Sequence, residues 1–501
     1  MGYIKGLFAL SVSTVLLASC GRGFEVAQEP ATVGVPILQK VTKETYMNGR
    51  KFCDIFTNTE DADTKEIGKW IDVPFDYSDR SKTIKIYAFT KREFDPNLPS
   101  YIFVDGGPGQ NTHTFPDILG SGFNEIHFDQ RGVGCSAPET WDEYINQALY
   151  SSLKTANDIE EIRKAYGINA VSIYGVSYGT VPATIYANRF EANVKSIVVE
   201  GVLGKIENLA RYTHRVEKYN LILSSLTEVQ REAFDEVIYG ESQKQKYVLM
   251  YLLGTAGFRD GGYRLIRDNY FKKLFPESGG ISKSEFDRAY ANISKEQNPY
   301  NTAQHPGATD ENVLTRFYCK ELGGFSKDKF TINYHRTKGF VEEIAQDKTS
   351  WADDCKEQGI SLAMENPYDE RQYPTKATVY YLQGSHDGAT IAAGALSHWK
   401  TVPQKKSYFM LSLKGGHNPG LTKINSKDGE IAKLHKQLYS DAFSGMAITA
   451  DFVKQLNAQI KAATNENDKN QSYITWQLFN SNKVDVSELE KEFGGLRRLK
   501  Q

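Results

Sequence analysis

Residues 171–180 read Val-Ser-Ile-Tyr-Gly-Val-Ser-Tyr-Gly-Thr, with Ser177 at the centre of a Gly-x-Ser-x-Gly pattern. The apolar, β-branched start of this stretch predicts a buried strand, and the glycines predict a sharp turn into a helix. Because Gly175 and Gly179 have no Cβ, the hydroxyl of Ser177 can stand clear of the backbone and meet a base. The stretch therefore predicts a nucleophilic serine of the hydrolase type, with a turn that carries no chemistry as the alternative.

The composition excludes one class of partner. The chain has 501 residues, with 60 Lys and Arg against 62 Asp and Glu and a net charge of -2, so there is no electrostatic case for nucleic-acid binding. With 40% hydrophobic residues it can bury a large core. This length fits one large domain with an insertion, or two to three smaller domains.

The N-terminal stretch predicts export. One lysine precedes a short apolar run in residues 1–19, which is too short to span a bilayer and is typical of a signal peptide. Residues 17–20, Leu-Ala-Ser-Cys, resemble a bacterial lipobox, in which Cys20 is lipidated and anchors the protein to a membrane. Gly21 favours the outer membrane, by resemblance to Gram-negative lipoproteins. Residues 20–45 would be the tether, and an ordinary signal peptide with an incidental cysteine is the alternative.

Four cysteines remain if Cys20 is lipidated: Cys53, Cys135, Cys319 and Cys355. An exported compartment permits disulfides, and four cysteines allow three connectivities. We expect a bond between Cys319 and Cys355 because these two lie close in the chain. The pairing of the other two is left open, and four free thiols are the alternative.

The first half of the chain alternates between strand-like and helix-like stretches. Strands are predicted at residues 83–89, 101–104, 125–128, 171–174 and 196–199. Residues 157–166 predict an amphipathic helix with an Asn/Asp start and Gly167 as its stop. The order strand, helix, strand predicts an α/β fold with a mostly parallel, doubly wound sheet over residues 46–204.

The second half contains a long interruption of this alternation. Residues 205–372 show helical stretches without clear strands, which predicts an inserted helical lid. Strand-like runs resume at 378–382 and 407–411, so residues 373–425 would complete the core. Residues 426–501 are predicted to form a helical extension.

A serine needs a base to take its proton and an acid to orient that base. Asp387 and His417 each follow a strand-like run, and strand ends are where α/β enzymes place functional groups. The order Ser177, Asp387, His417 is that of α/β-hydrolases. His386 is an alternative base, although the adjacent Asp387 could not orient it well, and Glu200 is an alternative acid. A turn-forming aspartate and a surface-loop histidine are the alternatives without chemistry.

Acyl transfer also requires hydrogen-bond donors for the developing oxyanion. Residues 105–109, Asp-Gly-Gly-Pro-Gly, follow a predicted strand and form a glycine loop whose N–H groups are free to point into a cleft. The backbone N–H of Tyr178 would be the second donor. A simple tight turn is the alternative for the glycine run.

Three segments match the motifs of one family. Residues 105–109 resemble the His-Gly-Gly-Pro-Gly loop of the proline iminopeptidase and tripeptidyl aminopeptidase family of α/β-hydrolases. Residues 129–138 resemble its Asp-Gln-Arg-Gly-x-Gly-x-Ser-x-Pro segment, and residues 175–180 resemble its nucleophile turn. Residues 71–77 also resemble the segment that opens the catalytic domain of larger, exported members. The resemblance implies an α/β-hydrolase fold with an inserted helical lid.

The resemblance also implies roles for single residues. Ser177 would be the nucleophile, Asp387 the orienting acid and His417 the base. Gly107 and Tyr178 would donate to the oxyanion. The implied activity is removal of residues from the N-termini of short peptides, without a metal or organic cofactor. A carboxylesterase with the same triad and a non-catalytic surface lipoprotein remain alternatives, and the oligomeric state is open.

Two acidic residues are candidates for binding the substrate. An aminopeptidase must hold a free α-ammonium, which requires an acidic group near the nucleophile. Residues 319–321, Cys-Lys-Glu, resemble a Cys-x-Glu element in the lid of some members, so Glu321 is one candidate. Asp105 replaces the family's histidine in the glycine loop, which either changes how the loop is held or adds negative charge near the amine.

Overall fold

The computed structural model describes the folded body of the chain. The described residues are 53, 66–113, 117–204, 226–297 without 243, 247, 250, 251 and 253–265, then 313, 316–322, 368–402, 407–424, 426, 428–463 and 475–480. The predicted signal peptide and tether, including Cys20, lie outside these residues, as does Cys355. Within the described part, no helix has the length and apolar character needed to cross a membrane.

One sheet forms the centre of the molecule. In spatial order its strands are β1 (Ile67–Asp76), β2 (Asp79–Thr90), β4 (Asn124–Phe128), β3 (Ser100–Val104), β5 (Val171–Val176), β6 (Val194–Glu200), β7 (Thr378–Gly384), β8 (Ser407–Ser412) and β9 (Trp476–Asn480). From β4 to β8 neighbouring strands are parallel, whereas β1, β2 and β9 pair antiparallel. The predicted mostly parallel sheet is confirmed.

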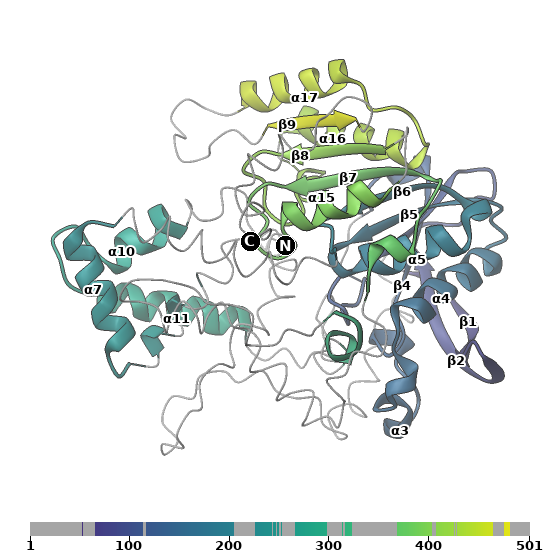
Figure 1. Cartoon of the computed structure of the whole chain (residues 1–501), viewed down its shortest axis with the longest axis horizontal. Coiled ribbons are helices and arrows are strands. Elements are labelled where there is room, and N and C mark those ends of the chain that lie inside the picture. The colour runs from purple at the N-terminus through teal and green to yellow at the C-terminus, as the bar shows by residue number, and fades with distance from the viewer. Residues whose placement is uncertain are drawn as a thin grey trace, which may run out of the picture.

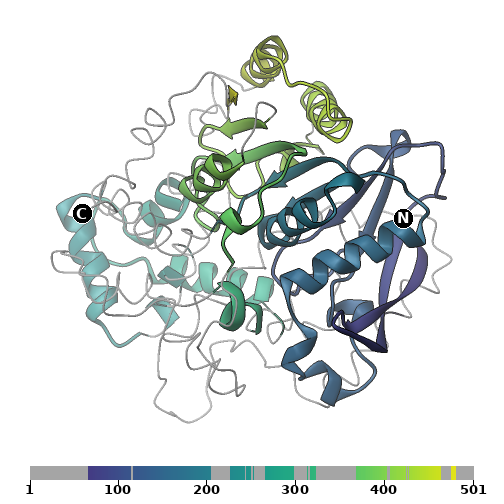
Figure 2. The ribbon, with the colours of Figure 1, turned by 45° about the vertical axis from the view of Figure 1, so that its right-hand side comes forward.

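Helices cover both faces of this sheet (Figures 1 and 2). One core cluster joins the sheet to α4 (Ser152–Ala165), α5 (Thr180–Arg189) and α15 (Ala392–Thr401), and a second joins it to α16 (Gly429–Phe443) and α17 (Ala450–Ala463). Successive side chains of β3 point to opposite faces of the sheet. Ile102 and Val104 belong to the first cluster, and Tyr101 and Phe103 belong to the second. The sheet is therefore doubly wound, as predicted.

Between β6 and β7, the regular secondary structure that the structure describes is helical. Its elements are α7 (Glu228–Tyr239), a π-helical turn at Arg267–Phe271, α10 (Lys272–Leu274), α11 (Lys283–Gln297), a π-helical turn at Tyr318–Leu322 and a short 3-10 turn at Glu370–Gln372. Because β6 and β7 pair directly, this segment is an insertion that leaves the sheet at the end of β6. In Figure 1, α7, α10 and α11 lie to one side of the sheet. Their action as a lid stays a prediction.

The start of α4 differs from the prediction. The helix begins at Ser152, because the side chain of Ser151 caps it by accepting from the N–H of Leu153. Asn157 and Asp158, which were expected to start the helix, lie buried inside it. The predicted stop is confirmed, since Gly167 has a φ of 69°, a left-handed conformation that glycine adopts easily.

The C-terminal extension is helical only in part. Helices α16 and α17 follow the last core strand, as expected, but β9 then pairs antiparallel with β8 and extends the sheet. The prediction of a helical extension is therefore correct for α16 and α17 and wrong for β9. The side chain of Trp476 explains the pairing, because it is buried in the core cluster beneath α16 and α17.

Two disulfides involve the described cysteines. Cys53 forms a disulfide with Cys135, 82 positions further along the chain. Cys319 is also disulfide-bonded. If Cys20 is lipidated, the bond between Cys53 and Cys135 leaves Cys355 as the partner of Cys319. Because Cys355 lies outside the described residues, that pairing stays a prediction.

Candidate active site

The candidate residues lie where neighbouring parallel strands end. Asp105 follows β3, Ser177 follows β5, Glu200 ends β6, and Asp387 and His417 come in the loops after β7 and β8. These five strands are adjacent in the sheet. Because the carboxyl ends of parallel strands share one edge, residues far apart in sequence meet there.

Ser177 occupies a strained turn between β5 and α5. Its φ is 55°, a left-handed conformation that is uncommon for a residue with a side chain. The flanking glycines are required by space: a Cβ on Gly179 would lie 2.0 Å from the carbonyl oxygen of Val104, and one on Gly175 would lie 2.5 Å from that of Gly179. The turn can therefore approach β3 closely, as the sequence pattern predicts.

Asp387 and His417 form a buried hydrogen-bonded pair. The Nδ1 atom of His417 lies 2.9 Å from Oδ2 of Asp387. The other oxygen of Asp387 accepts from the N–H groups of Ala389 (2.8 Å) and Thr390 (2.9 Å), which fixes the carboxylate. Gly201 packs against the imidazole, because a Cβ there would come within 2.9 Å of Cε1 of His417. This geometry holds the ring with Nδ1 toward the acid.

Sequence reasoning missed Thr390. Its hydroxyl donates to Oδ2 of Asp387 at 2.8 Å and lies 3.2 Å from Nδ1 of His417, so it contacts both members of the pair. The only sequence signal was its position three residues after Asp387 in the same loop.

Glu200, the alternative acid, has other partners. It accepts hydrogen bonds from the N–H groups of Gly420 (2.8 Å) and Leu421 (3.0 Å) and from the hydroxyls of Tyr174 (2.6 Å) and Tyr439. Burial raises the pKa of this carboxyl, against the opposing effect of these hydrogen bonds. Glu200 therefore anchors the loop that follows His417.

The glycine loop touches the candidate nucleophile. A Cβ on Gly106 would lie 2.9 Å from Cβ of Ser177 and 3.4 Å from its Oγ. Gly107 follows with a φ of 105°, which glycine tolerates. The two predicted oxyanion donors, the N–H groups of Gly107 and Tyr178, thus belong to segments in contact, and their role stays a prediction.

Asp105 is built into the base of this loop. Its Oδ1 accepts from the N–H of Gly106 at 2.6 Å, and its carbonyl oxygen accepts from Nε2 of Gln130 at 2.8 Å. Burial raises the pKa of Asp105 well above its usual range. Of its two predicted roles, these contacts favour holding the loop over supplying charge to a substrate.

Glu321 lies near the residue that follows the nucleophile. Its two carboxylate oxygens accept from the N–H of Ser152 at 3.0 and 3.1 Å, and one of them also accepts from the hydroxyl of Ser152. That hydroxyl lies 2.8 Å from the hydroxyl of Tyr178. Burial raises the pKa of Glu321. The insertion therefore brings a carboxylate to the N-terminus of α4, beside the nucleophile turn.

The segment at 129–138 acts as a scaffold. The guanidinium of Arg131 is buried and donates to both carboxylate oxygens of Asp158 on α4, at 2.5 and 2.6 Å. It also donates to the carbonyl oxygens of Pro74 (2.7 Å) and Phe75 (3.0 Å) on β1. Arg131 therefore ties an edge strand to a core helix.

A charged cluster adjoins this scaffold, and sequence reasoning did not predict it. The Nδ1 atom of His113 lies 2.9 Å from a carboxylate oxygen of Glu66, and Nε2 lies 2.8 Å from Oδ2 of Asp129. Burial alone would lower the pKa of His113, but the charges and hydrogen bonds of the two carboxylates outweigh it and raise the pKa to about 10. The cluster lies beside the disulfide between Cys53 and Cys135, because the backbone N–H of Cys135 donates to Oδ2 of Asp129 at 2.7 Å.

Comparison with known proteins supports the fold. A family model described as alpha/beta hydrolase fold matches residues 101–237. The chain is similar to a putative hydrolase, YuaR, of Escherichia coli (strain K12), with 28% identity over 27% of this chain and 36% of that protein. It is also similar to a proline iminopeptidase of Lactobacillus delbrueckii subsp. lactis, with 27% identity over 24% of this chain and 41% of that protein. The chain thus spans less than half the length of these curated relatives.

Solved structures give a more distant likeness. A proline iminopeptidase-related protein from Thermus thermophilus is 14% identical, with 76% of this chain and 98% of that chain covered and a TM-score of 0.36. An alpha/beta fold family hydrolase from Bacillus anthracis str. Sterne is 17% identical, with 75% and 99% covered and a TM-score of 0.39. Likenesses at this level carry no argument about function. The family match and the strand order show an alpha/beta hydrolase fold, and part of the chain is weakly similar to proline iminopeptidases.

Proposed function

We propose that this protein is a serine hydrolase that removes residues from the N-termini of short peptides. The fold family supports a hydrolase, and the weakly related proline iminopeptidases support the peptide substrate. One observation carries the proposal: the hydrogen-bonded pair of Asp387 and His417 lies at the same sheet edge as Ser177 on its left-handed turn.

The chemistry follows from these positions. Ser177 Oγ attacks the carbonyl carbon of the scissile amide while Nε2 of His417 takes the hydroxyl proton, and Asp387 stabilises the resulting imidazolium through Nδ1. The oxyanion accepts from the N–H groups of Gly107 and Tyr178, each donor being worth about 10²- to 10³-fold in rate. His417 then protonates the leaving amine, and water hydrolyses the acyl-enzyme by the same steps in reverse.

Glu321 is the stronger candidate for holding the substrate's α-ammonium. A carboxylate offers about four acceptor positions, so its bonds from Ser152 leave room for another donor. Asp105 is the weaker candidate, because burial raises its pKa well above its usual range, whereas at Glu321 the hydrogen bonds from Ser152 oppose the rise in pKa that burial causes.

The place of action belongs to the same proposal. With Cys20 lipidated, the enzyme would be anchored at the outer membrane and would face peptides in the periplasm or outside the cell. Mass spectrometry of the mature N-terminus tests this: a lipid-modified Cys20 supports the anchor, and an unmodified residue at the N-terminus contradicts it.

The substrate class is tested with matched pairs of chromogenic peptide amides, one to three residues long, that have a free or an acetylated N-terminus. We expect turnover of the free amines and at least a tenfold lower kcat/KM for the acetylated forms. Equal rates on both, together with fast cleavage of simple esters, would indicate a carboxylesterase. No turnover of either class would contradict an enzymatic role.

The variant Glu321→Gln tests whether Glu321 binds the α-ammonium of the substrate, independently of the catalytic triad. We expect this variant to raise KM for free peptide amides by at least tenfold, because it removes the charge that pairs with the ammonium. Hydrolysis of p-nitrophenyl acetate, which has no amine, should stay within twofold of the wild type. An equal loss on both substrates would indicate that Glu321 only supports the fold.

A further inference from the structure

A second group of chemically active side chains lies on β4 and in the segment before it. Glu125 and His127 are two residues apart on the strand, so their side chains leave the same face of the sheet. Asp117 comes from the preceding segment. One ligand atom from each residue lies within 4.8 Å of the other two, and we refer to these three residues as the β4 cluster.

His127 has a polar ring in an apolar position. It is wholly buried: the ring of Phe89 stacks on it at 5.3 Å between centroids, and the ring of Phe103 lies tilted against it at 5.2 Å. Neither ring nitrogen has a hydrogen-bond partner among the described residues, although Nε2 lies 3.2 Å from Oε1 of Glu125. A buried imidazole without hydrogen bonds is costly, so its position calls for a partner that accepts a nitrogen lone pair.

Glu125 points one oxygen toward this nitrogen. Its Oε2 accepts from the N–H of Ile118 at 2.8 Å, which fixes the carboxylate. Its Oε1, like the ring of His127, lacks a hydrogen bond in the part of the chain that the structure describes. The two atoms therefore lie within ion-pair distance, at 3.2 Å, but their contact does not have the geometry of a hydrogen bond.

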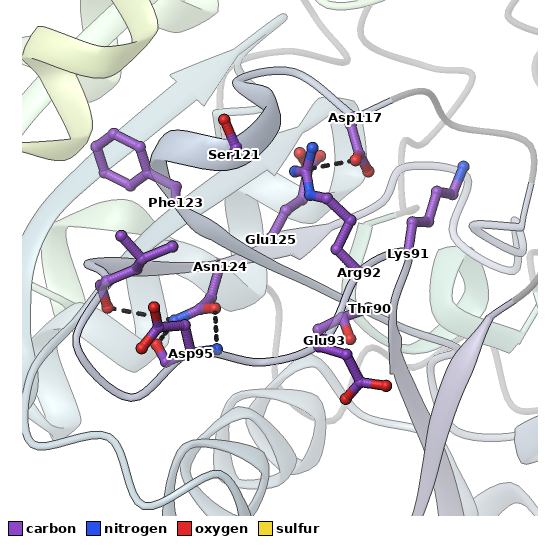
Figure 3. Close-up of a pocket in the computed structure, with 11 residues that line it drawn as sticks. Thr90, Lys91, Arg92, Glu93, Asp95, Asp117, Ser121, Phe123, Asn124 and Glu125 are labelled. Atoms are coloured by element: carbon purple, nitrogen blue, oxygen red, sulfur yellow. Dashed lines mark hydrogen bonds and ion pairs between the residues drawn. The ribbon is translucent and has the colours of Figure 1, made fainter.

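A cavity of about 220 Å³ is lined by two members of the β4 cluster, Asp117 and Glu125 (Figure 3). Its lining contains four carboxylates and two cations: Glu93, Asp95, Asp117 and Glu125 against Lys91 and Arg92. This excess of negative charge favours entry of a cation. Arg92 pairs with Asp117 at 3.0 Å and also donates to the carbonyl oxygen of Gly120, but its side chain is 42% exposed, so a cation that binds Asp117 can displace it.

A neighbouring group of similar composition does not fit a metal. His113, Asp129 and Cys135 also lie close together. However, the sulfur of Cys135 is bonded to Cys53, and both nitrogens of His113 already pair with Glu66 and Asp129. In the β4 cluster, by contrast, Nε2 of His127 and Oε1 of Glu125 have no hydrogen bond among the described residues.

We propose that the β4 cluster binds a divalent metal ion of the zinc class. The ligands would be Nε2 of His127, Oε1 of Glu125 and a carboxylate oxygen of Asp117, with water from the cavity completing the shell. Zinc bonds of about 2.0–2.1 Å in a tetrahedron place ligand atoms roughly 3.3–3.4 Å apart. Nε2 of His127 and Oε1 of Glu125 are 3.2 Å apart, close to this separation. One nitrogen and two carboxylate oxygens also suit zinc or manganese better than calcium.

The site would join β4 to the segment that carries Asp117 and takes no part in the serine chemistry. Its expected effect is on stability, because a ligand that binds only the folded state raises the unfolding midpoint. The proposal therefore stands or falls independently of the proposed hydrolase activity.

The test uses tag-free, EDTA-treated full-length protein titrated with ZnCl₂ by calorimetry and by thermal unfolding. We expect one ion per chain, a micromolar or tighter Kd and a rise of several degrees in the unfolding midpoint. Asp117→Asn, at a partly exposed position, should weaken binding at least tenfold. His127→Phe should abolish it, and Asp117→Asn still decides the matter if the buried variant does not fold.

Glu93→Gln is the matched control, because it removes a carboxylate from the same cavity outside the cluster. It should bind zinc within twofold of the wild type. Absence of saturable binding in the wild type would overturn the proposal. Wild-type affinity in Asp117→Asn, or an equal loss in Glu93→Gln, would also overturn it, because the ion would then be bound elsewhere or only by diffuse charge.

Discussion

Oδ2 of Asp387 lies 2.9 Å from Nδ1 of His417, although the two residues are 30 positions apart in the chain. The loops after β7 and β8 bring them together, and both side chains are buried. The pair gives the imidazole a defined tautomer, which a serine base requires.

Asp387→Asn tests this relationship. The amide has the shape of the acid but can donate to Nδ1, which would hold His417 in the wrong tautomer. We expect kcat on the best peptide amide to fall by about 10²- to 10⁴-fold with little change in the far-ultraviolet circular dichroism spectrum. Asp451→Asn, at an exposed position on α17, is the control and should keep full activity. A loss of less than fivefold in Asp387→Asn would argue against this residue as the acid.

Glu200→Ala should destabilise the loop after His417. The change leaves the N–H groups of Gly420 and Leu421 and two tyrosine hydroxyls without their acceptor. Each buried donor left unpaired costs about 1–3 kcal/mol, so the free energy of unfolding should fall by roughly 3 kcal/mol or more. Tyr439→Phe removes one donor instead of the acceptor and should cost about 1 kcal/mol. Denaturant unfolding compares the two, and similar costs would contradict an anchoring role for Glu200.

The cluster of Glu66, His113 and Asp129 predicts a pH dependence of stability. The pKa of His113 rises from an ordinary value of 6.5 to about 10 on folding, so the protonated ring stabilises the folded state. That contribution is complete below pH 6.5 and is lost as the pH rises toward 10. The free energy of unfolding should therefore decrease over this range, by at most about 1.4 kcal/mol per pH unit from this group.

His113→Asn isolates this contribution. Guanidinium unfolding at pH 6.5 and 9.5 should show that the variant is much less stable than the wild type at the lower pH and closer to it at the higher pH. A difference between variant and wild type that does not change with pH would show that His113 is neutral in the folded protein.

The catalytic candidates could be predicted because their signals are local. Each of Ser177, Asp387 and His417 follows an apolar run that forms a parallel strand, and the topology of such sheets brings strand ends together. Gly175 and Gly179 flank Ser177, which is the residue of that turn with a left-handed backbone conformation although it carries a side chain. Strand pattern and glycine placement were therefore sufficient to choose these residues.

Other features depend on contacts that sequence pattern does not carry. Asn157 and Asp158 resemble helix starters, but Asp158 is buried inside α4 because Arg131 pairs with it. Strand β9 is only five residues long and is formed by pairing with β8 rather than by its own pattern. The partners of His113 are 47 and 16 residues away, so no local signal marks that cluster.

The central claim is that Ser177 is the nucleophile, and a fluorophosphonate probe followed by peptide mass mapping tests it most directly. The account predicts one adduct per wild-type chain, located on Ser177, and no adduct in Ser177→Ala or in wild-type protein unfolded before exposure. A wild-type chain that remains unlabelled, or a variant that is labelled to the same extent, would contradict it.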